Sequence, residues 1–310
     1  MLSTLKLLAD PTRLRLLRIL EQGDFTVQDL TTILAMGQSR ISRHLKLMVR
    51  EGLLQLDKQG TWHYYRLAPS NDFYVEIRDA VKNRFNMLIN YDRDMAGLLR
   101  VTDERRRRNR QFFDSHAGDL DGMHEALLNL PDYRRDLFAL VPQGGLIVEI
   151  GVGTGRLLPD LAGIGDRVIG VDHSPAMIDL ARECAERVPH GKIDLRLAEM
   201  IHLPVETTSA DTVVMNQVLH HAELPILVLK EINRILKPGG LLLIADLVRH
   251  DHDWVRQQLA DQWLGFSEPE LLTWCTEAGF KKLRYQAVGR TGQQQVLLLT
   301  AIKIAPLNPN

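Results

Sequence analysis

The first 70 residues contain three short segments whose hydrophobic positions recur at helical spacing. In 11–22, 27–35 and 38–50, leucine, isoleucine and methionine stand three or four positions apart, which predicts three amphipathic helices. Asp10 and Thr26 precede the first two segments. Both residue types favour a helix N-terminus, because their side chains accept a hydrogen bond from a backbone N–H.

Two strand-like runs follow the third helix. They occupy 53–57 and 62–67 and are joined by Lys58-Gln59-Gly60, a sequence typical of a hairpin turn. Two helices at a sharp turn followed by a basic hairpin predict a winged helix-turn-helix DNA-binding domain over residues 1–70.

The hydrophobic period changes along the rest of the chain. Residues 73–100 carry a long helical pattern with few helix breakers, and 111–142 indicate further helix. From Gly145, five β-rich runs alternate with helical segments and two closing strand-like runs follow, which is typical of a mainly parallel sheet with crossover helices. We therefore expect an α/β chain with a dimerisation helix and linker at 71–110 and a Rossmann-like, seven-stranded domain at 111–310.

Charge is distributed unevenly along the chain. Of the 310 residues, 38 are Lys or Arg and 39 are Asp or Glu, yet residues 1–110 hold 20 of the basic and 13 of the acidic ones. A basic first part indicates that it faces a polyanion, although the run 105–108, four arginines, equally fits a solvated helix face. The N-terminus lacks a signal-peptide pattern and no apolar stretch approaches membrane-spanning length, so we expect a cytoplasmic protein with no membrane partner.

The third helix presents a polar face that suits base recognition. Arginine pairs with guanine, glutamine with adenine and serine with either, whereas basic side chains on the hairpin would contact flanking phosphates. A winged helix used for protein contact is the alternative. The residues expected on double-stranded operator DNA are Gln38, Ser39, Arg40, Ser42, Arg43, His44 and Lys46 on the helix and Lys58, His63 and Arg66 on the hairpin.

Residues 3–68 resemble the ArsR/SmtB family of bacterial repressors, above all in the run RISRHLKLMVREGLL. The resemblance implies a homodimer, a near-palindromic operator and release of DNA when an effector binds. Soft-metal sensors of the family carry two thiolates on the second helix, but Thr26 and Gln28 stand at those positions here. Residues 73–100 hold no histidine for the family's other metal site. We therefore expect no metal site and an effector that binds elsewhere in the chain.

A glycine-rich stretch, VEIGVGTG at 148–155, follows the first predicted strand of the second domain and opens a helix. Glycines at such a turn let the backbone approach a ligand closely. Asp172 ends the next strand, where a carboxylate suits the two hydroxyls of a ribose. A dinucleotide site of the type G-x-G-x-x-G would need a third glycine where Arg156 stands.

The spacing G-x-G-x-G resembles class I S-adenosylmethionine-dependent methyltransferases, as do VDHSPAMIDLAR, AEMIHLPVETTSADTVVMNQVLHH and LKPGGLLLIADL. The resemblance covers about 145–300 and implies S-adenosylmethionine or S-adenosylhomocysteine as cofactor. It implies glycines under the methionine and ribose, an acidic residue near the methionine ammonium, and a carboxylate that accepts from the adenine amino group. The family more often has Asp at this last position, where this chain has Glu199. The implied cofactor-binding residues are Glu149, Gly151, Gly153, Gly155, Asp172, His173, Met177, Glu199, Met200, Asn216 and Gln217.

The sequence leaves open whether the second domain is an enzyme, because methyl transfer needs little beyond in-line positioning and sometimes a general base. His220, His221 and the cluster at 250–253 are candidate bases, and the catalytic residues stay unassigned. Arsenic methylation would need several thiolates, whereas Cys184 and Cys275 are expected on helices away from the glycine loop. A DNA methyltransferase is disfavoured, because its (N/D/S)PP(Y/F/W) and Pro-Cys motifs are absent from the sequence.

The fusion itself favours a sensor. A repressor-like domain without its familiar metal site is joined to a cofactor-binding domain, and such chains resemble regulators of methionine-cycle genes that respond to S-adenosylhomocysteine or S-adenosylmethionine. We expect 112–140 to cover the cofactor with Phe112, Phe113 and His116 and to act on the dimerisation helix through 100–111. The alternative is an active methyltransferase on a small molecule whose DNA-binding domain regulates its own operon.

Overall fold

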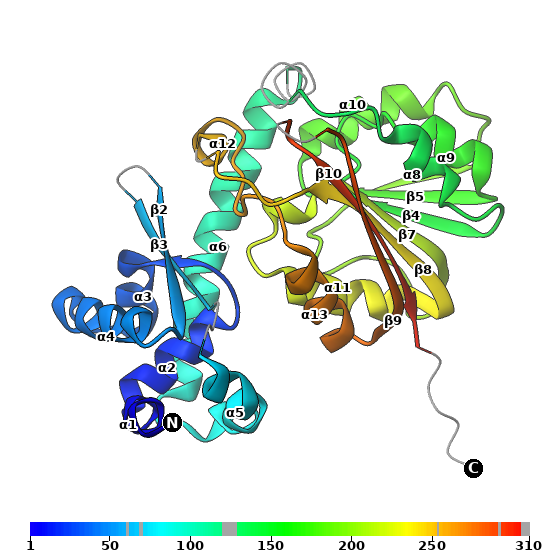
Figure 1. Cartoon of the computed structure of the whole chain (residues 1–310). Helices are drawn as coiled ribbons and strands as arrows, with labels where there is room; N and C mark the ends of the chain where they lie inside the picture. Colours follow the sequence, from blue (N-terminus) through cyan, green and yellow to red (C-terminus); the bar gives the residue numbers. More distant parts are fainter. Residues whose placement is uncertain (60–61, 68–70, 120–128, 253, 291–292, 305–310) are drawn as a thin grey trace, which may run out of the picture. The chain divides into compact units, whose positions relative to one another are not determined.

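The chain divides into two units, Met1–Arg107 and Arg108–Asn310, each with its own hydrophobic core (Figure 1). The structure is a computed structural model that describes residues 1–59, 62–67, 71–119, 129–252, 254–290 and 293–304. The segment 71–110, expected as dimerisation helix and linker, falls almost entirely within the first unit.

The first unit contains a helix-turn-helix followed by a hairpin wing. Asp10 caps the second helix by accepting from the backbone N–H of Arg13, and Thr26 and Asp29 form a reciprocal capping box at the next helix. Strands β2 and β3 pair antiparallel, and the short β1 adds to the free side of β3. The elements are α1 (Leu2–Leu8), α2 (Pro11–Leu20), β1 (Phe25–Thr26), α3 (Val27–Leu34), α4 (Gln38–Arg50), β2 (Leu54–Gln59), β3 (Trp62–Leu67), α5 (Asp72–Lys82), the 3-10 turn η1 (Phe85–Met87) and α6 (Tyr91–His116).

The three predicted helices and the hairpin are confirmed, with one change at the turn. Strand β2 continues to Gln59, and Lys58 pairs with His63 across the hairpin, so Lys58 and Gln59 belong to the strand instead of the turn. Gly60, the last residue of the expected turn, lies outside the described residues.

Helix α6 is fastened to α2 and α3 at three places. The fully buried carboxylate of Asp94 accepts two hydrogen bonds from Arg15 of α2, at 2.7 and 2.6 Å. Arg105 forms an ion pair of 2.8 Å with Asp29 in the first turn of α3. Gly97 lies against the α3 backbone so closely that a Cβ there would come within 2.3 Å of a carbonyl oxygen. This part of α6 therefore packs without intervening side chains on the first helix of the helix-turn-helix.

The single long helix expected over 73–100 is wrong. Helix α5 ends at Lys82, and α6 begins at Tyr91 after Asn90 has adopted a φ of 67°. Between them Phe85 turns into the core of the unit and is buried, so burial of one large side chain overrides the helical pattern. Asparagine tolerates the left-handed conformation better than most residues, which makes it a suitable residue for the break.

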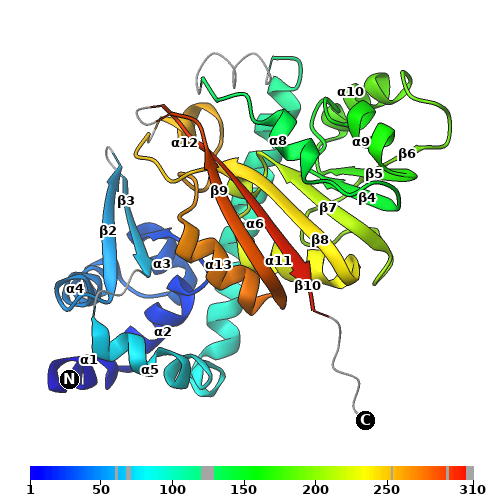
Figure 2. The ribbon, with the colours of Figure 1, turned by 45° about the vertical axis from the view of Figure 1, so that its right-hand side comes forward.

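The second unit is a seven-stranded sheet with helices on both faces (Figure 2), which confirms the expected Rossmann-like fold. The strand order is β6-β5-β4-β7-β8-β10-β9; the first five strands are parallel to one another, and β10 runs antiparallel to both of its neighbours, β8 and β9. The strands are β4 (Leu146–Ile150), β5 (Arg167–Asp172), β6 (Ile193–Leu197), β7 (Ala210–Asn216), β8 (Leu236–Leu247), β9 (Phe280–Val288) and β10 (Val296–Lys303). The helical elements are α8 (Arg134–Ala139), α9 (Leu158–Ile164), α10 (Pro175–Ala185), η2 (Leu219–His221), α11 (Pro225–Ile235), α12 (Val255–Gln258) and α13 (Glu268–Glu277).

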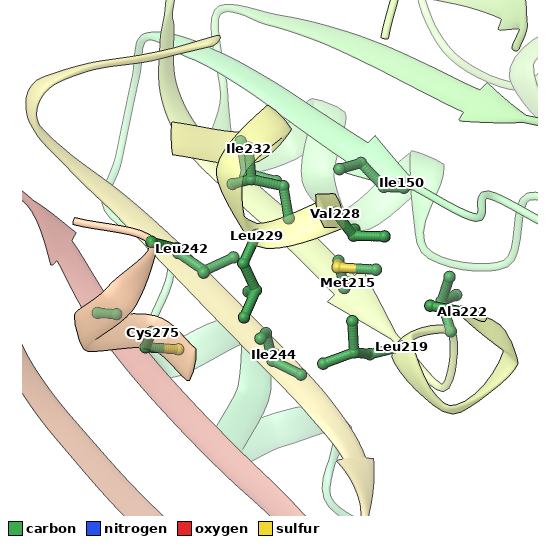
Figure 3. Close-up of a cluster of buried hydrophobic side chains, with 14 of the residues drawn as sticks. Ile150, Met215, Leu219, Ala222, Val228, Leu229, Ile232, Leu242, Ile244 and Cys275 are labelled. Atoms are coloured by element: carbon green, nitrogen blue, oxygen red, sulfur yellow. The ribbon is translucent and has the colours of Figure 1, made fainter. Parts of the chain in front are cut away.

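Alternation along the strands feeds two separate cores, one on each face of the sheet. Met215 and Ile244 pack with α11 and α13 on one face, as Figure 3 shows, whereas Val214 and Leu243 pack with α8, α9 and α10 on the other. Because both faces are covered, the central strands β4 and β7 are mainly apolar, whereas the edge strands β6 and β9 carry charged residues. Residues at the strand ends then stay available for a ligand.

Two other expectations need adjustment. The helix expected over 111–142 is wrong in its extent, since α6 ends at His116 and α8 covers only Arg134–Ala139, with 120–128 outside the described residues. Among the described residues, no helix is long and apolar enough to cross a membrane.

Candidate functional sites

Helix α4 displays most of its predicted base-reading residues to solvent. Gln38, Ser39, Arg40, Arg43 and Lys46 are exposed, while its apolar positions are buried beneath them. The two remaining candidates of the helix, Ser42 and His44, are half-buried. Burial lowers the pKa of His44, which favours its neutral imidazole.

The wing residues differ in how they are placed. His63 is exposed, and of Lys58 the structure describes only the backbone, which pairs with His63. Arg66 departs from the expectation: its guanidinium is 12% exposed and binds the buried carboxylate of Asp24 at 3.0 and 3.1 Å. Arg66 therefore holds the wing to the residues that precede β1, and this ion pair would have to open before the guanidinium contacted a phosphate.

A cavity of about 540 Å³ lies at the carboxyl ends of β4, β5 and β7 in the second unit, a volume within the range of small-molecule sites. Nine of the eleven predicted cofactor residues line it: Glu149, Gly151, Gly153, Asp172, His173, Met177, Met200, Asn216 and Gln217. Gly155 and Glu199 are not among the lining residues.

The glycines of the loop after β4 have different tasks. At Gly151, φ is 70° and a Cβ would come within 2.3 Å of Val218, so a side chain is excluded there. Gly153 has a φ of 52°, and a Cβ there would meet nothing within 4 Å, which leaves open space beside its backbone. Gly155 faces α10, where a Cβ would lie 3.1 Å from Cβ of Cys184. Cys184 thus packs directly behind the loop, contrary to the expectation that it lies away from it.

Asp172 is held in place by the loops around it. Its carboxylate accepts from the backbone N–H of Gly153 at 2.9 Å and of Ser174 at 3.0 Å. His173 Nδ1 lies 3.4 Å from Asp172 Oδ1. Burial alone would lower the pKa of His173, but the neighbouring Asp172 outweighs it and raises the pKa. Within the described residues His173 Nε2 has no hydrogen-bond partner, so a ligand can bind it.

Glu149 carries a buried carboxyl group on the cavity wall. Burial, with a smaller contribution from Asp172, raises its pKa to about 8. Its Oε2 has no hydrogen-bond partner within the described residues. A buried acceptor without a partner is costly unless a ligand supplies a donor. The ammonium of a methionine moiety would supply one, so the residues present fit an adenosyl amino acid.

The end of α6 packs beside the part of this cavity where the adenosine is expected. Phe113 lines the cavity and meets the ring of His173 edge-on, at 5.6 Å between centroids. Asp114 accepts a hydrogen bond of 2.5 Å from Ser174, the N-cap of α10. Arg110 forms an ion pair with Glu199, the residue expected at the adenine amino group. An adenine bound at Glu199 would therefore share or displace the Arg110 contact.

The expected cover of the cavity is only partly found. Phe112 stacks on His116 at 4.4 Å, and neither residue lines the cavity. The lining also includes 129–134, and within it the Tyr133 hydroxyl donates to Asn216 at 2.8 Å. Gln217 has a φ of 57° beside this pair. Sequence reasoning missed Tyr133, because no motif around it marks a ligand site.

The two adjacent histidines of η2 are both buried. His220 Nδ1 lies 2.7 Å from Asp246 Oδ1, and its Nε2 faces Asp261. Burial disfavours the charged imidazole, but Asp246 and Asp261 outweigh it and raise the pKa of His220 to about 9. His221 lines the cavity and meets Phe113 edge-on at 4.9 Å.

A winged helix-turn-helix with an exposed polar recognition helix is thus joined to a sheet whose carboxyl edge holds a glycine loop, a fixed aspartate and a buried carboxyl group. These features define a DNA-binding domain linked to a domain of the S-adenosylmethionine-dependent methyltransferase fold. That fold implies S-adenosylmethionine or S-adenosylhomocysteine as the ligand.

Comparison with known proteins gives the two families. Residues 10–55 match the bacterial regulatory proteins of the arsR family, and 148–244 match the methyltransferase domain family. The chain therefore joins an ArsR-family helix-turn-helix domain to a methyltransferase domain.

Three similar proteins illustrate the two domains. The arsenical resistance operon repressor of Escherichia coli is 51% identical over 65 residues, 21% of this chain and 56% of that protein. The arsenite methyltransferase of Halobacterium salinarum is 35% identical over 115 residues, 36% of this chain and 29% of that protein. A methyltransferase from Aquifex aeolicus shares the fold with a TM-score of 0.51 and 22% identity over 62% of this chain and 98% of its own. The chain thus spans less than two thirds of the length of either sequence relative.

Proposed function

We propose that this chain is a dimeric transcriptional repressor whose methyltransferase domain binds S-adenosylhomocysteine or S-adenosylmethionine as an effector. The observation that carries the proposal is the continuity of α6. Its residues 94–105 pack on α2 and on α3, the first helix of the helix-turn-helix. Further along the same helix, Phe113 lines the cavity, and Arg110 and Asp114 contact residues beside it. A ligand that alters the contacts of one end therefore acts on an element that also supports the DNA-binding helices.

Two contacts of α6 lie at the adenosine side of the cavity, where a bound ligand would change them. The Arg110–Glu199 ion pair and the Asp114–Ser174 hydrogen bond hold the end of α6 to residues expected around the adenine and ribose. A ligand that takes Glu199 as an acceptor changes the first of these contacts. Such differential contacts are what a ligand needs in order to shift a conformational equilibrium.

Apolar side chains on the first unit support a homodimer. Leu2 and Leu5 on α1 and Val75 on α5 are exposed, at 68%, 44% and 54%. Thr4 and Asn71 hydrogen-bond to each other, which ties α1 to the N-cap of α5. A second copy of the chain would remove these side chains from water, and a two-fold dimer suits a near-palindromic operator.

The first experiment is fluorescence anisotropy of the full chain on labelled DNA from its own upstream region, at fixed salt. Salt is fixed because phosphate contacts make the affinity salt-dependent. We expect one adenosyl ligand to change operator affinity about 5- to 150-fold, which corresponds to a coupling of about 1–3 kcal/mol. A wild-type chain that binds both ligand and DNA without any such change would refute the sensor.

A substitution in α6 tests the route. Arg107 is exposed and lies between the two sets of α6 contacts. Arg107→Pro interrupts the helix, whereas the matched control Arg107→Ala keeps it. We expect the proline variant to bind ligand and DNA separately but to lose the ligand's effect on operator affinity. An unchanged effect in this variant would show that α6 is not the route.

Methyl transfer to a small molecule is the second candidate function. It is favoured by the likeness of residues in the second unit to methyltransferases. Arsenite as the acceptor is disfavoured, because the chain has only two cysteines, of which Cys275 is buried and has its pKa raised by burial to about 12. If neither adenosyl ligand changes operator affinity, transfer from labelled S-adenosylmethionine to candidate acceptors becomes the next assay.

A further inference from the structure

Three buried side chains meet beside the adenosyl cavity in an arrangement that the proposed function does not use. His220 and His221 come from η2, and Asp261 comes from the segment between α12 and α13. One ligand atom from each lies within 4.8 Å of the others, and all three side chains are at most 6% exposed. Although the sequence led us to expect no metal site, we propose that His220, His221 and Asp261 form a site for one divalent transition-metal ion of the zinc class.

The distances suit an ion better than direct contact. Asp261 Oδ1 lies 3.6 Å from His220 Nε2 and 3.7 Å from His221 Nδ1, both beyond hydrogen-bond range. Zinc binds imidazole nitrogen and carboxylate oxygen at about 2.0–2.2 Å, which places tetrahedral ligand atoms roughly 3.3–3.6 Å apart. The two distances from Asp261 are close to this spacing, and all three ligand atoms lie within 4.8 Å of one another, so an ion fits among them after side-chain adjustments.

The surroundings of His220 match those of a metal-ligating histidine. Its Nδ1 lies 2.7 Å from the fully buried carboxylate of Asp246. Asp246 is itself fixed, because it accepts from the backbone N–H of Leu247 at 2.7 Å. A proton on Nδ1 donated to Asp246 leaves the lone pair of Nε2 toward Asp261. Metal-binding histidines usually have such a carboxylate partner on the other nitrogen, which orients the ring and raises its basicity.

The donor set selects the class of ion. Two imidazoles and one carboxylate suit zinc, cobalt, nickel or ferrous iron, whereas calcium and magnesium prefer oxygen ligands and soft ions prefer thiolates. Three protein ligands also leave a coordination position for water or a small molecule. Since His221 lines the cavity, the ion would stand at the cavity wall.

A proton on His220 Nε2 is the competing occupant of the same position. An imidazolium would normally approach a carboxylate to about 2.7–2.9 Å, closer than the 3.6 Å found here. A proton and an ion give different results in a metal titration, so the two are separable by experiment.

The test uses the full chain, stripped with a chelator and kept free of DNA and adenosyl ligands. Cobalt(II) is titrated in at pH 7.5 while the visible absorption is recorded, and zinc is then added to displace it. We expect one cobalt per chain with the intense absorption of a four- or five-coordinate site, and its loss on addition of zinc. Elemental analysis after dialysis should give one zinc per chain.

Variants locate the ion. Asp261→Asn removes a ligand charge at equal size and should weaken cobalt binding more than 10-fold, and Asp246→Asn should weaken it about 10- to 100-fold. His252→Gln is the control, because His252 is exposed and its ring lies 5.1 Å from that of His250, the other histidine pair of the unit. Circular dichroism and S-adenosylhomocysteine binding check that the variants fold.

Three outcomes overturn the proposal. One is a wild-type chain that binds no stoichiometric cobalt, as expected if a proton occupies the position. The second is unchanged binding by Asp261→Asn, and the third is loss of binding in His252→Gln, which would place the ion at the exposed pair. The wild-type stoichiometry needs no variant to fold. None of these outcomes depends on whether an adenosyl ligand regulates DNA binding.

Discussion

The recognition helix α4 and the adenosyl cavity handle polar side chains in opposite ways. On α4, five of the seven predicted contact residues are exposed to water before any DNA arrives. In the cavity, the Glu149 carboxyl group is 2% exposed and its Oε2 has no hydrogen-bond partner within the described residues. The first site is solvated in the absence of its ligand, whereas the second is desolvated.

On α4, protein stability and ligand binding are therefore independent of each other. In the cavity, the two are coupled. An exposed side chain contributes little to the free energy of unfolding, so α4 can change its specificity without a change in fold. A buried polar group without a partner destabilises the ligand-free domain until a ligand donates to it. The buried carboxyl group thus lowers the stability of the ligand-free domain and raises the affinity for a ligand that can donate to it. Three substitutions test this contrast.

The largest effect is expected at a buried carboxylate that does have a partner. Asp94→Ala would leave the guanidinium of Arg15, 11% exposed, without its bidentate acceptor. Removing one member of a buried ion pair costs about 3–5 kcal/mol. We expect the unfolding free energy of the first unit, measured by urea denaturation, to fall by that amount. The exposed neighbour Asp92→Ala is the control, and equal effects of the two variants would contradict the pairing.

The unpartnered carboxyl group should behave differently. Glu149→Gln keeps the size of the side chain but cannot form a charged pair with a ligand ammonium. We expect S-adenosylhomocysteine affinity, measured by calorimetry, to fall by about 1.5–3 kcal/mol, or roughly 10- to 150-fold, the range for a hydrogen bond to a charged group. The stability of the ligand-free domain should not fall. A variant that loses stability but keeps its affinity would reverse the contrast.

The same variant fixes the sign of a pH effect. Burial raises the pKa of Glu149 from 4.5 to about 8, so the folded chain binds this proton more tightly than the unfolded chain. The resulting stability is fully present below about pH 4.5 and is lost as pH rises toward 8, at up to about 1.4 kcal/mol per pH unit. The wild type should therefore lose stability relative to Glu149→Gln over this window. Parallel pH profiles would contradict the assignment.

The smallest effect on protein stability is expected on the recognition helix, where a substitution should change only the affinity for DNA. Arg43→Ala should weaken specific operator binding by about 1–3 kcal/mol if Arg43 reads a base edge. The melting temperature of this variant should equal that of the wild type, because the Arg43 side chain is exposed. Arg284→Ala on β9 removes an equally exposed arginine and serves as the charge control. Equal losses of operator affinity in the two variants would rule out direct reading by Arg43.

The sequence predicted those parts of the molecule that local rules govern. Helix α4 has the bounds that its amphipathic pattern indicated, and the α3 capping box stands where Thr26 and Asp29 placed it. The sequence placed the glycine loop and Asp172 at neighbouring strand ends, and the backbone N–H of Gly153 does donate to Asp172, whereas their role in ligand binding stays a prediction. What stayed unpredictable depends on contacts between distant segments.

Three residues illustrate that limit. Phe85 ends a helical pattern because the core accommodates its ring, and nothing in the neighbouring residues announces this burial. Tyr133 reaches Asn216, which lies 83 positions further along the chain, and so joins the cavity through tertiary structure alone. Arg66 is a third case, since the partner that withdraws it from solvent, Asp24, lies 42 positions away.

The contact between Gly97 and Ile33 has a mechanical consequence. A Cβ on Gly97 would come within 2.3 Å of the Ile33 carbonyl oxygen, so α6 and α3 touch backbone to backbone. Side chains can accommodate a displacement by changing rotamer, but two backbones in contact cannot. A displacement of α6 at Gly97 would therefore be transmitted to α3 with little loss of amplitude.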